Sequence, residues 1–214
     1  MPTRLICLAN SFKEGGRCIA GIELDSNNIP VFVNSIPKWI RPVCNTEHGE
    51  IPNNIAQPFK ILDIIELDVT GLKPESYQSE NVTFNETSIK TVGTFERNKL
   101  VNLCDGRSLI FRNKGKAVSL DAIGTLNHSL MLASVNQFEV TQKIYEDKPG
   151  KSQIRLVFTY NDNRYDFPVT DPVFLHRHQG NPDFLVGAAQ VYLCLSLGIA
   201  WEGWHYKLIA GIIF

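Results

Sequence analysis

The sequence predicts an all-β protein with one or two short helices, folded as small β-barrels. Most of its 214 residues fall into short apolar runs, several of which alternate in period two and are separated by turn residues. Ala-Gly pairs inside two of these runs permit the bends or bulges with which a sheet closes. The regular alternation of strand and helix that a parallel sheet requires is absent. These observations favour small barrels over a doubly wound sheet.

In chain order, we expect strands at residues 4–9, 17–24, 38–43, 61–70, 108–111, 129–135, 138–144, 154–160, 164–169, 191–197 and 205–214. The clearest pair is a hairpin, because Asn161-Asp162-Asn163 is a turn signal between two alternating runs. Helical signals are few. Thr94 can cap a short helix over residues 95–103. Asp171-Pro172 reads as an N-cap followed by proline at the first helical position, and Gly180-Asn181-Pro182 ends that helix.

The two ends of the chain contain similar hairpins. Near the N-terminus, Ile6-Cys7-Leu8 precedes a polar turn and Ile19-Ala20-Gly21-Ile22. Near the C-terminus, Leu193-Cys194-Leu195 precedes a turn and Ile209-Ala210-Gly211-Ile212. Two related barrels would explain the similarity. Chance agreement of short apolar runs, or a shared need for small residues at a bend, would explain it equally well.

The stretch from residue 71 to residue 94 is polar and is interpreted as a long surface connection. We therefore divide the chain into a first barrel over residues 1–80, with the C-terminal strands as candidates to join it, and a second barrel over residues 81–214.

Composition narrows the class of protein. The formal net charge is −1, which excludes a protein that coats nucleic acid with its whole surface but leaves room for a local basic face. The five cysteines form no C-x-x-C pair and are expected as buried, reduced thiols of a cytoplasmic protein. No apolar stretch approaches the length of a transmembrane helix and no signal peptide is evident, so no membrane partner is expected.

The first candidate contacts lie around the turn Glu14-Gly15-Gly16-Arg17. This turn lacks the lysine and hydroxyl residue of a P-loop and leads into no helix, so it is first a hairpin turn. Its polar residues, Asn10, Ser11, Lys13 and Arg17, are candidates for contact with a backbone phosphate.

A second candidate is the strand that contains Lys38, Trp39 and Arg41. Trp39 and Arg41 share one face of a strand, which would give a stacking platform with a phosphate partner. The alternative is a core tryptophan with an arginine packed on it at the rim.

The third candidate is the hairpin with Arg155, Arg164 and Tyr165, whose interleaved aromatic and arginine residues suit base stacking. Its alternative is an ordinary amphipathic edge hairpin. The turn 105–107 and the stretch Arg112-Asn113-Lys114-Gly115-Lys116 are interpreted as solvated basic turns.

Signals for catalysis are weak. The pair His176 and His178 lacks a nearby carboxylate pattern, and no nucleophile elbow or clustered metal ligands are visible. Asp63, Glu66, Asp68 and His176 are the remaining guesses for an enzyme acting on nucleotides. We expect no catalytic residue, no metal and no cofactor.

With these pieces in place, the chain resembles a prokaryotic family described as a dual OB-fold domain. The resemblance rests on Leu8-Ala9-Asn10-Ser11 with the following Gly16 to Gly21 run, on Trp39-Ile40-Arg41-Pro42-Val43, on Gln78-Ser79-Glu80-Asn81, and on Tyr206-Lys207-Leu208-Ile209-Ala210-Gly211-Ile212. It implies two fused OB-like barrels and a context of nucleic-acid processing or defence in bacteria or phage. Lys207, in the last piece, joins the candidate contacts. The resemblance supplies no catalytic residues.

The predicted function is therefore a non-catalytic module that binds nucleic acid, with single-stranded or distorted DNA or RNA preferred over regular duplex. The second hypothesis is an interaction subunit that docks a partner enzyme. The third is an enzyme acting on nucleotides. Nucleic-acid binding predicts exposed basic and aromatic residues that converge, whereas an interaction subunit predicts an exposed apolar patch or an unpaired edge strand.

Overall fold

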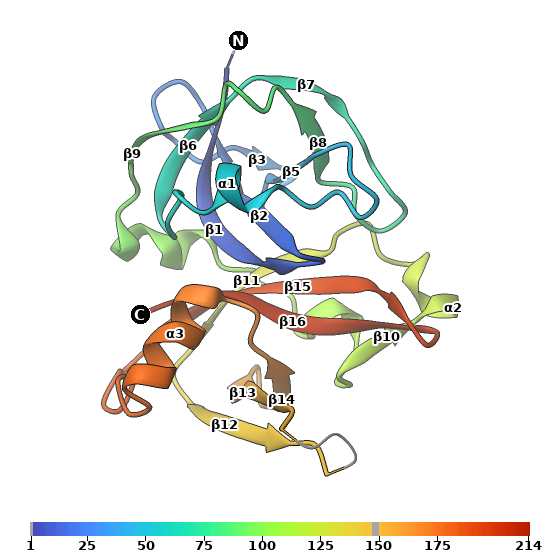
Figure 1. Ribbon diagram of the computed structural model, residues 1–214, viewed down its shortest axis with the longest axis vertical. Coiled ribbons are helices and arrows are strands. Elements are labelled where there is room, and N and C mark those ends of the chain that lie inside the picture. The colour runs from blue at the N-terminus through green and yellow to red at the C-terminus, as the bar shows by residue number, and fades with distance from the viewer. Residues whose placement is uncertain (1, 147–149) are drawn as a thin grey trace. The chain divides into compact units, whose positions relative to one another are not determined.

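The computed structural model describes residues 2–146 and 150–214. The chain forms two compact units, and the first extends to Leu103 and includes Asn127–Ser129. The second comprises Cys104–Leu126 and Leu130–Phe214. Strands dominate both units and the helices are short, which confirms the predicted fold class (Figure 1).

The first unit contains β1 (Thr3–Lys13), β2 (Gly16–Leu24), β3 (Phe32–Val33), β4 (Ile36–Pro37), β5 (Trp39–Val43), α1 (Asn53–Ala56), β6 (Asp63–Leu67), β7 (Val69–Leu72), β8 (Asn81–Phe84), β9 (Lys90–Thr94) and the 3₁₀ helix η1 (Arg97–Leu103). Its main sheet has the order β7-β8-β5-β2-β1-β6-β9, and β5 pairs with β8 in parallel. Only Asp68 separates β7, at one end of this order, from β6, which lies next to β9 at the other end, so the chain itself connects the two sides of the sheet. The sheet therefore curls into a barrel.

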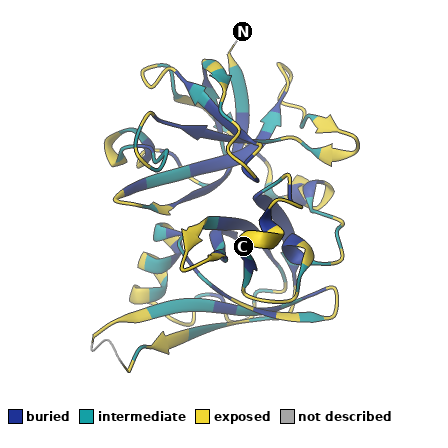
Figure 2. Ribbon diagram, turned by 90° about the vertical axis from the view of Figure 1, so that its right-hand side faces the viewer, coloured by how far each residue is buried: buried dark blue, intermediate teal, exposed yellow. Residues whose placement is uncertain are grey.

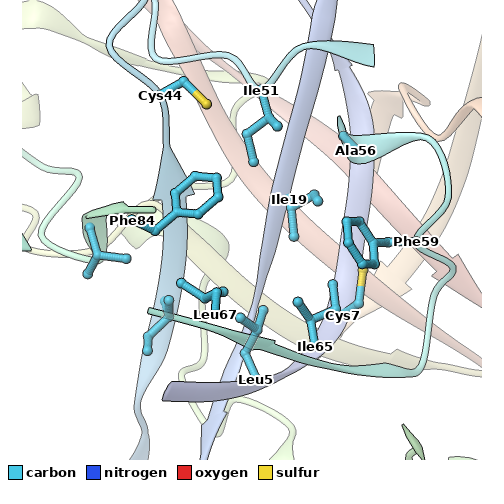
Figure 3. Packing of buried hydrophobic residues seen from close by; sticks show 12 residues of the cluster. Leu5, Cys7, Ile19, Cys44, Ile51, Ala56, Phe59, Ile65, Leu67 and Phe84 are labelled. Atoms are coloured by element: carbon cyan, nitrogen blue, oxygen red, sulfur yellow. The ribbon is translucent and has the colours of Figure 1, made fainter. Parts of the chain in front are cut away.

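The core of this barrel is formed by inward-facing residues of β1, β2, β5, β6 and β8, together with residues from around α1. Figure 3 shows Leu5, Ile19 and Ile65 facing Phe59 and Phe84 across it. Leu5, Ile19 and Ile65 are completely buried, so they supply the apolar area that stabilises the unit.

Gly21 lets two strands approach closely. It pairs with Cys7 of β1 beside a register shift between Cys7 and Ala9. A Cβ atom at Gly21 would lie 1.7 Å from the carbonyl oxygen of Ile6, which no side chain allows. The Ala-Gly pair of β2 thus marks a bulged site in the barrel wall, as the sequence predicts.

The second unit contains η2 (Ile110–Arg112), β10 (Ala117–Ser119), α2 (Leu120–Ile123), β11 (Leu130–Val135), β12 (Phe138–Ile144), β13 (Ser152–Tyr160), β14 (Asn163–Pro168), α3 (Pro172–Gly180), β15 (Val191–Trp201) and β16 (Trp204–Ile213). Its sheets have the orders β10-β16-β15-β11 and β12-β13-β14. Val169, directly after β14, pairs in parallel with Ile209 of β16 and so links the two sheets.

The two units share one connectivity. In each, three antiparallel strands precede a short helix and two further strands, and the third strand runs parallel to the fifth. In the first unit these strands are β1, β2, β5, β6–β7 and β8–β9; in the second they are β11–β12, β13, β14, β15 and β16. This is the five-stranded arrangement of an OB-like barrel.

Several local predictions are confirmed. The β13–β14 hairpin turns at Asn161 and Asp162, whose φ angles of 45° and 61° fit a type I′ turn. The carboxylate of Asp171 accepts hydrogen bonds from the backbone N–H groups of Val173 and Phe174, so it caps α3. The expected helix over residues 95–103 is the 3₁₀ helix η1.

The interpretation of residues 71–94 as a surface connection is wrong, because β8 and β9 lie within it and belong to the first sheet. The first unit accordingly continues past residue 80, where the sequence placed the boundary. The C-terminal strands β15 and β16 pair within the second unit.

Candidate functional site

The tip of the β1–β2 hairpin combines an exposed aromatic ring with an arginine. Phe12 is 55% exposed, and the Cζ atom of Arg17 lies 4.6 Å from the centroid of its ring. The Nε of Arg17 donates to Oδ1 of Asn53 at 3.1 Å, and Nδ2 of Asn53 donates to the carbonyl oxygen of Gly15 at 2.8 Å. The first residue of α1 therefore holds the guanidinium over the ring while leaving the aromatic side chain open to solvent.

Lys13 lies at the same tip and pairs across the turn with Gly16. The turn residues Glu14 and Gly15 have φ angles of 41° and 80°, so this is the hairpin turn expected from the sequence. Lys13 is half-buried, and burial lowers the pKa of its amine. Lys13 follows Phe12 on the strand, so its side chain leaves the opposite face of the hairpin and its amine lies close to Gly49. Arg17 is therefore the cation that shares a face with Phe12.

Asn10 and Ser11 lie further down β1, in the barrel wall, and both are buried. Nδ2 of Asn10 donates to the carbonyl oxygens of Ala56 and Phe59, both at 2.8 Å. Asn10 therefore ties the segment that contains α1 to β1. Its side-chain amide is thus used to position the segment that contains Asn53, the residue that holds Arg17 at the tip.

Arg41 of β5 is buried, with 2% exposure, rather than presented to solvent. Its Nη2 lies 3.2 Å from Oε1 of Glu80 and donates to the hydroxyl of Ser129 at 2.8 Å. Ser129 in turn donates to Glu80, and Nη1 of Arg41 reaches Oδ1 of Asn81 at 3.4 Å. This buried ion pair joins β5 to β8, so its cation faces a carboxylate of the protein.

Trp39 and Lys38 lie at the other end of β5 from the hairpin tip. Trp39 is half-buried and pairs with Ile22, and Nζ of Lys38 forms an ion pair with Glu23 at 2.5 Å. The residues expected to converge on one groove are therefore distributed. Arg17 lies at the hairpin tip and Lys13 points to the other face of the same hairpin. Trp39 and Lys38 lie elsewhere on the barrel, and Arg41 is inside it.

The β13–β14 hairpin separates its three candidates in the same way. Arg155 is half-buried, and its Nε forms an ion pair with Asp166 at 2.6 Å. Tyr165 is a core residue whose ring stacks on Phe158, with centroids 5.7 Å apart. Arg164 is exposed.

Lys207 of β16 is fully buried. Its Nζ donates to the carbonyl oxygens of Ile110 and Asn113, at 2.7 and 2.8 Å, and to Oδ1 of Asn113 at 2.8 Å. Burial lowers the pKa of this amine to about 7. Lys207 therefore organises the loop before β10 from inside the unit.

Two sets of exposed residues are not among those that the sequence patterns indicate. Trp201 and Trp204 flank the two-residue turn of the β15–β16 hairpin, and they are 66% and 46% exposed. The run Trp-Glu-Gly-Trp carries the signal, since Glu-Gly can form a two-residue turn and residues on either side of such a turn are cross-strand partners. The second set lies on the β3–β4 hairpin, which Figure 2 shows as largely exposed.

Two of the three carboxylates considered for catalysis, those of Asp63 and Glu66, are engaged in structural contacts, whereas Asp68 is exposed. Glu66 forms ion pairs with Arg4 at 2.9 Å and Lys90 at 3.1 Å, and the hydrogen bond from Arg4 lowers the pKa of its carboxyl. Oδ2 of Asp63 accepts a hydrogen bond from the backbone N–H of Lys60. Within residues 2–146 and 150–214, no group of three or more His, Cys, Asp or Glu residues could hold a metal ion.

Across the described part of the chain, no helix has both the length and the apolar character needed to cross a membrane.

The two barrels define a protein of the tandem OB-fold class. The sequence model of the dual OB-containing domain matches residues 3–212, so the chain belongs to the dual OB-containing domain family. This confirms the family resemblance seen in the sequence. A comparison with curated proteins gives no match.

Solved structures with a similar course of the chain are distant. "Crystal structure of the tetrameric p202 HIN2" has 11% identity and a TM-score of 0.31, over 100% of this chain and 92% of that one. "Structural mimicry for functional antagonism" has 13% identity and a TM-score of 0.32, over 97% and 86%. "Molecular basis for abrogation of activation of pro-inflammatory cytokines" has 14% identity and a TM-score of 0.33, over 97% and 88%. We base no functional conclusion on structures this distant.

Proposed function

We propose that the protein binds single-stranded nucleic acid, and that the β1–β2 tip is a contact site. The observation that carries the proposal is the exposed ring of Phe12 with the anchored guanidinium of Arg17 beside it. An exposed aromatic ring can stack on an unpaired base, and a neighbouring arginine can bind the phosphate that follows. In OB-like barrels the loop between the first two strands, which is this turn, is one of the usual ligand-binding loops.

Asn53 preorganises Arg17, whereas Lys13 lies on the other face of the hairpin and contributes positive charge only from behind the ring. Among the other candidates of the first unit, Asn10, Ser11 and Arg41 support the proposal as parts of the scaffold, because their side chains are buried. The net charge of −1 implies modest, salt-sensitive affinity that depends on local cations. The prokaryotic processing or defence context, and the absence of catalysis, stay predictions.

The test is fluorescence anisotropy with labelled single-stranded DNA, single-stranded RNA and duplex DNA at about 50 and about 200 mM salt. We expect the single strands to bind more tightly than the duplex at low salt, with affinity that falls as salt rises. The double variant Phe12→Ala, Arg17→Ala should weaken binding about tenfold or more, since a stacked base contributes ~1–3 kcal/mol.

The matched control is Val92→Ala, Lys99→Ala, which also removes one exposed apolar and one exposed basic side chain from the first unit. This control should bind like the wild type. Equal affinities for the wild type and for the Phe12, Arg17 variant would exclude the tip as a contact site. An absence of binding to any nucleic acid at low salt would overturn the proposed function.

The β3–β4 hairpin favours a second candidate function, the docking of a partner protein. Ile29, Phe32, Val33 and Ile36 are all exposed on or next to this hairpin. Neighbouring exposed apolar side chains are a common mark of protein interfaces. A Phe32→Ser, Ile36→Ser variant should abolish partner capture, or self-association in sedimentation velocity, without changing nucleic-acid affinity. Unchanged association in both assays would exclude this hairpin as an interface.

A further inference from the structure

We propose that the second unit carries a separate surface that stacks unpaired bases, formed by Trp201, Trp204 and Tyr206 and flanked by the basic loop of residues 112–116. The inference rests on the proposed function for its ligand class, but on different residues for its site.

The geometry of the β15–β16 tip places two tryptophans on one face. Trp201 and Trp204 are direct cross-strand partners, so their side chains leave the sheet on the same side. The intervening residues Glu202 and Gly203 have φ angles of 49° and 84°, which fit a tight type I′ turn. His205, the next residue of β16, points to the opposite side and is buried. The tryptophans therefore lie on the solvent-facing side.

Tyr206 extends this face along β16, because residues two apart on a strand share a side. The edge strand β10 borders it, with Ser119 paired to Trp204 and Ala117 paired to Tyr206. Both neighbours are small, so the aromatic rings are flanked by little side-chain bulk. The backbone N–H of Leu120 donates to the carbonyl oxygen of Gly203 at 3.2 Å, which fixes the tip against the start of α2 (Figure 1).

A basic loop borders the same strand. Arg112, Lys114 and Lys116 are exposed within five consecutive residues. The carbonyl oxygen of Lys116 accepts a hydrogen bond from the backbone N–H of Lys207 at 2.9 Å, so the loop ends next to Tyr206. The positively charged loop therefore adjoins the aromatic surface at Tyr206.

Contacts inside the second unit hold the basic loop of residues 112–116 in one conformation. The ammonium of Lys207 binds the carbonyl oxygens of Ile110 and Asn113 from inside the unit. Phe111 and Arg112 have φ angles of 46° and 62°, a strained conformation for two consecutive non-glycine residues. Phe111 is 1% exposed, which fixes the loop further. These contacts preset where Arg112 projects.

Charge selects the ligand class. A row of aromatic rings alone could bind an apolar partner, but three cations on the adjoining loop favour a polyanion that also carries flat apolar rings. Glu202 and Asp121 are exposed near the tip and oppose phosphate there. They favour a strand that places its bases over the tryptophans and its phosphates toward Lys114 and Lys116. A single-stranded nucleic acid has both features, whereas regular duplex hides its base faces.

The test uses the full chain and a labelled oligothymidylate of about 10 nucleotides, a length within the range that one OB barrel covers. We expect Trp201→Ala, Trp204→Ala, introduced into the Phe12→Ala, Arg17→Ala background so that the first site cannot mask the loss, to weaken binding about tenfold or more. Trp201→Phe, Trp204→Phe in the same background should retain most of the binding. An abasic oligonucleotide of the same length should bind the background protein and the alanine variant equally. Thermal melting of each variant verifies folding.

Charge is tested separately. Lys114→Glu, Lys116→Glu should weaken binding and reduce the salt slope by about 2, whereas Lys143→Glu, Lys151→Glu makes the same charge change elsewhere in the unit and should have a much smaller effect. Unchanged affinity when Trp201→Ala, Trp204→Ala is added to that background, in protein that still folds, overturns this inference alone. Unchanged affinity in the Phe12, Arg17 variant overturns only the first site, and failure of the wild type to bind overturns both.

Discussion

The β1–β2 and β15–β16 hairpins have similar paired strands but different residues at their turns, which we call the tips. Each second strand reads Ile-Ala-Gly-Ile, and in each the glycine pairs with a cysteine, Gly21 with Cys7 and Gly211 with Cys194. In each a register shift lies beside that cysteine. The tips have no such sequence similarity. One carries Phe12 and Arg17, and the other carries Trp201 and Trp204.

The two hairpins also occupy different places in their barrels. β1–β2 forms the first two strands of its unit, whereas β15–β16 forms the last two of the other. The common sequence therefore reflects a common strand geometry, a glycine paired with a cysteine beside a register shift. It does not mark equivalent positions of a repeat. What differs, the tips, is where contact with a ligand is proposed.

The barrels also bury a cation in different ways. The first neutralises Arg41 with the carboxylate of Glu80, whereas the acceptors contacting Lys207 in the second are uncharged oxygens. We expect substitutions of buried residues in the strands to lower stability, and substitutions of exposed residues at the tips to weaken binding.

The largest effect on stability is expected from Glu80→Ala, which removes the carboxylate that faces the buried Arg41. Loss of one partner of a buried ion pair costs ~3–5 kcal/mol of unfolding free energy. Urea denaturation should show this loss, whereas the exposed Glu47→Ala should stay within ~0.5 kcal/mol of wild type. A small effect of Glu80→Ala would mean that the network contributes little to the first barrel.

The next effect is expected from Lys207→Met, which removes the donor to Ile110 and Asn113. Buried acceptors left without a donor cost ~1–3 kcal/mol each. Hydrogen exchange should accelerate in residues 110–116 and β10 more than in the first unit. Uniform acceleration in both units would contradict a local role.

The same lysine gives a pH dependence. Its pKa is lowered to about 7, below the ordinary value of 10.5. Between these values the unfolded chain binds the extra proton, so the free energy of unfolding should rise with pH, by up to ~1.4 kcal/mol per unit. The difference between wild type and Lys207→Met, measured by denaturation at pH 7 to 9, should grow accordingly. A flat difference would indicate that the three oxygens keep the amine protonated.

A smaller effect is expected from Gly21→Ala, because the new methyl group would overlap the Ile6 carbonyl and force β1 and β2 apart. Overpacking of this kind costs ~1–3 kcal/mol. Gly124→Ala, at a helical φ of −62° with open space around it, is the control and should be neutral within ~0.5 kcal/mol. Equal melting temperatures for the two variants would show that β1 and β2 can move apart at Gly21 at little cost in stability.

The sequence predicts those elements that follow simple patterns. Alternating strands, the Asn161-Asp162 turn and the Asp171 cap are local signals, and all three are present. It missed β8 because Glu80 and Asn81 are polar and suggest exposure, although their partner Arg41 allows them to be buried. Arg41 and Lys207 likewise suggest surface cations in the sequence, because the oxygens that allow each to be buried lie far away along the chain.

The candidate site was predictable in part. The polar turn indicated Lys13 and Arg17, but Phe12 gave no sign of being exposed, since apolar residues in a strand are usually assigned to the core. Trp201 and Trp204 were overlooked because large aromatic residues are usually assigned to the core. The Glu202-Gly203 turn predicts that the two rings share a face, but which face meets solvent depends on how the sheet packs within its unit.

The most direct measurement of the central claim is the affinity of the fourfold variant Phe12→Ala, Arg17→Ala, Trp201→Ala, Trp204→Ala for single-stranded oligothymidylate at about 50 mM salt. If the tips bind nucleic acid and the strands behind them carry the fold, the variant should melt like the wild type yet bind at least about tenfold more weakly. A variant that melts normally and binds as tightly as the wild type would contradict the account.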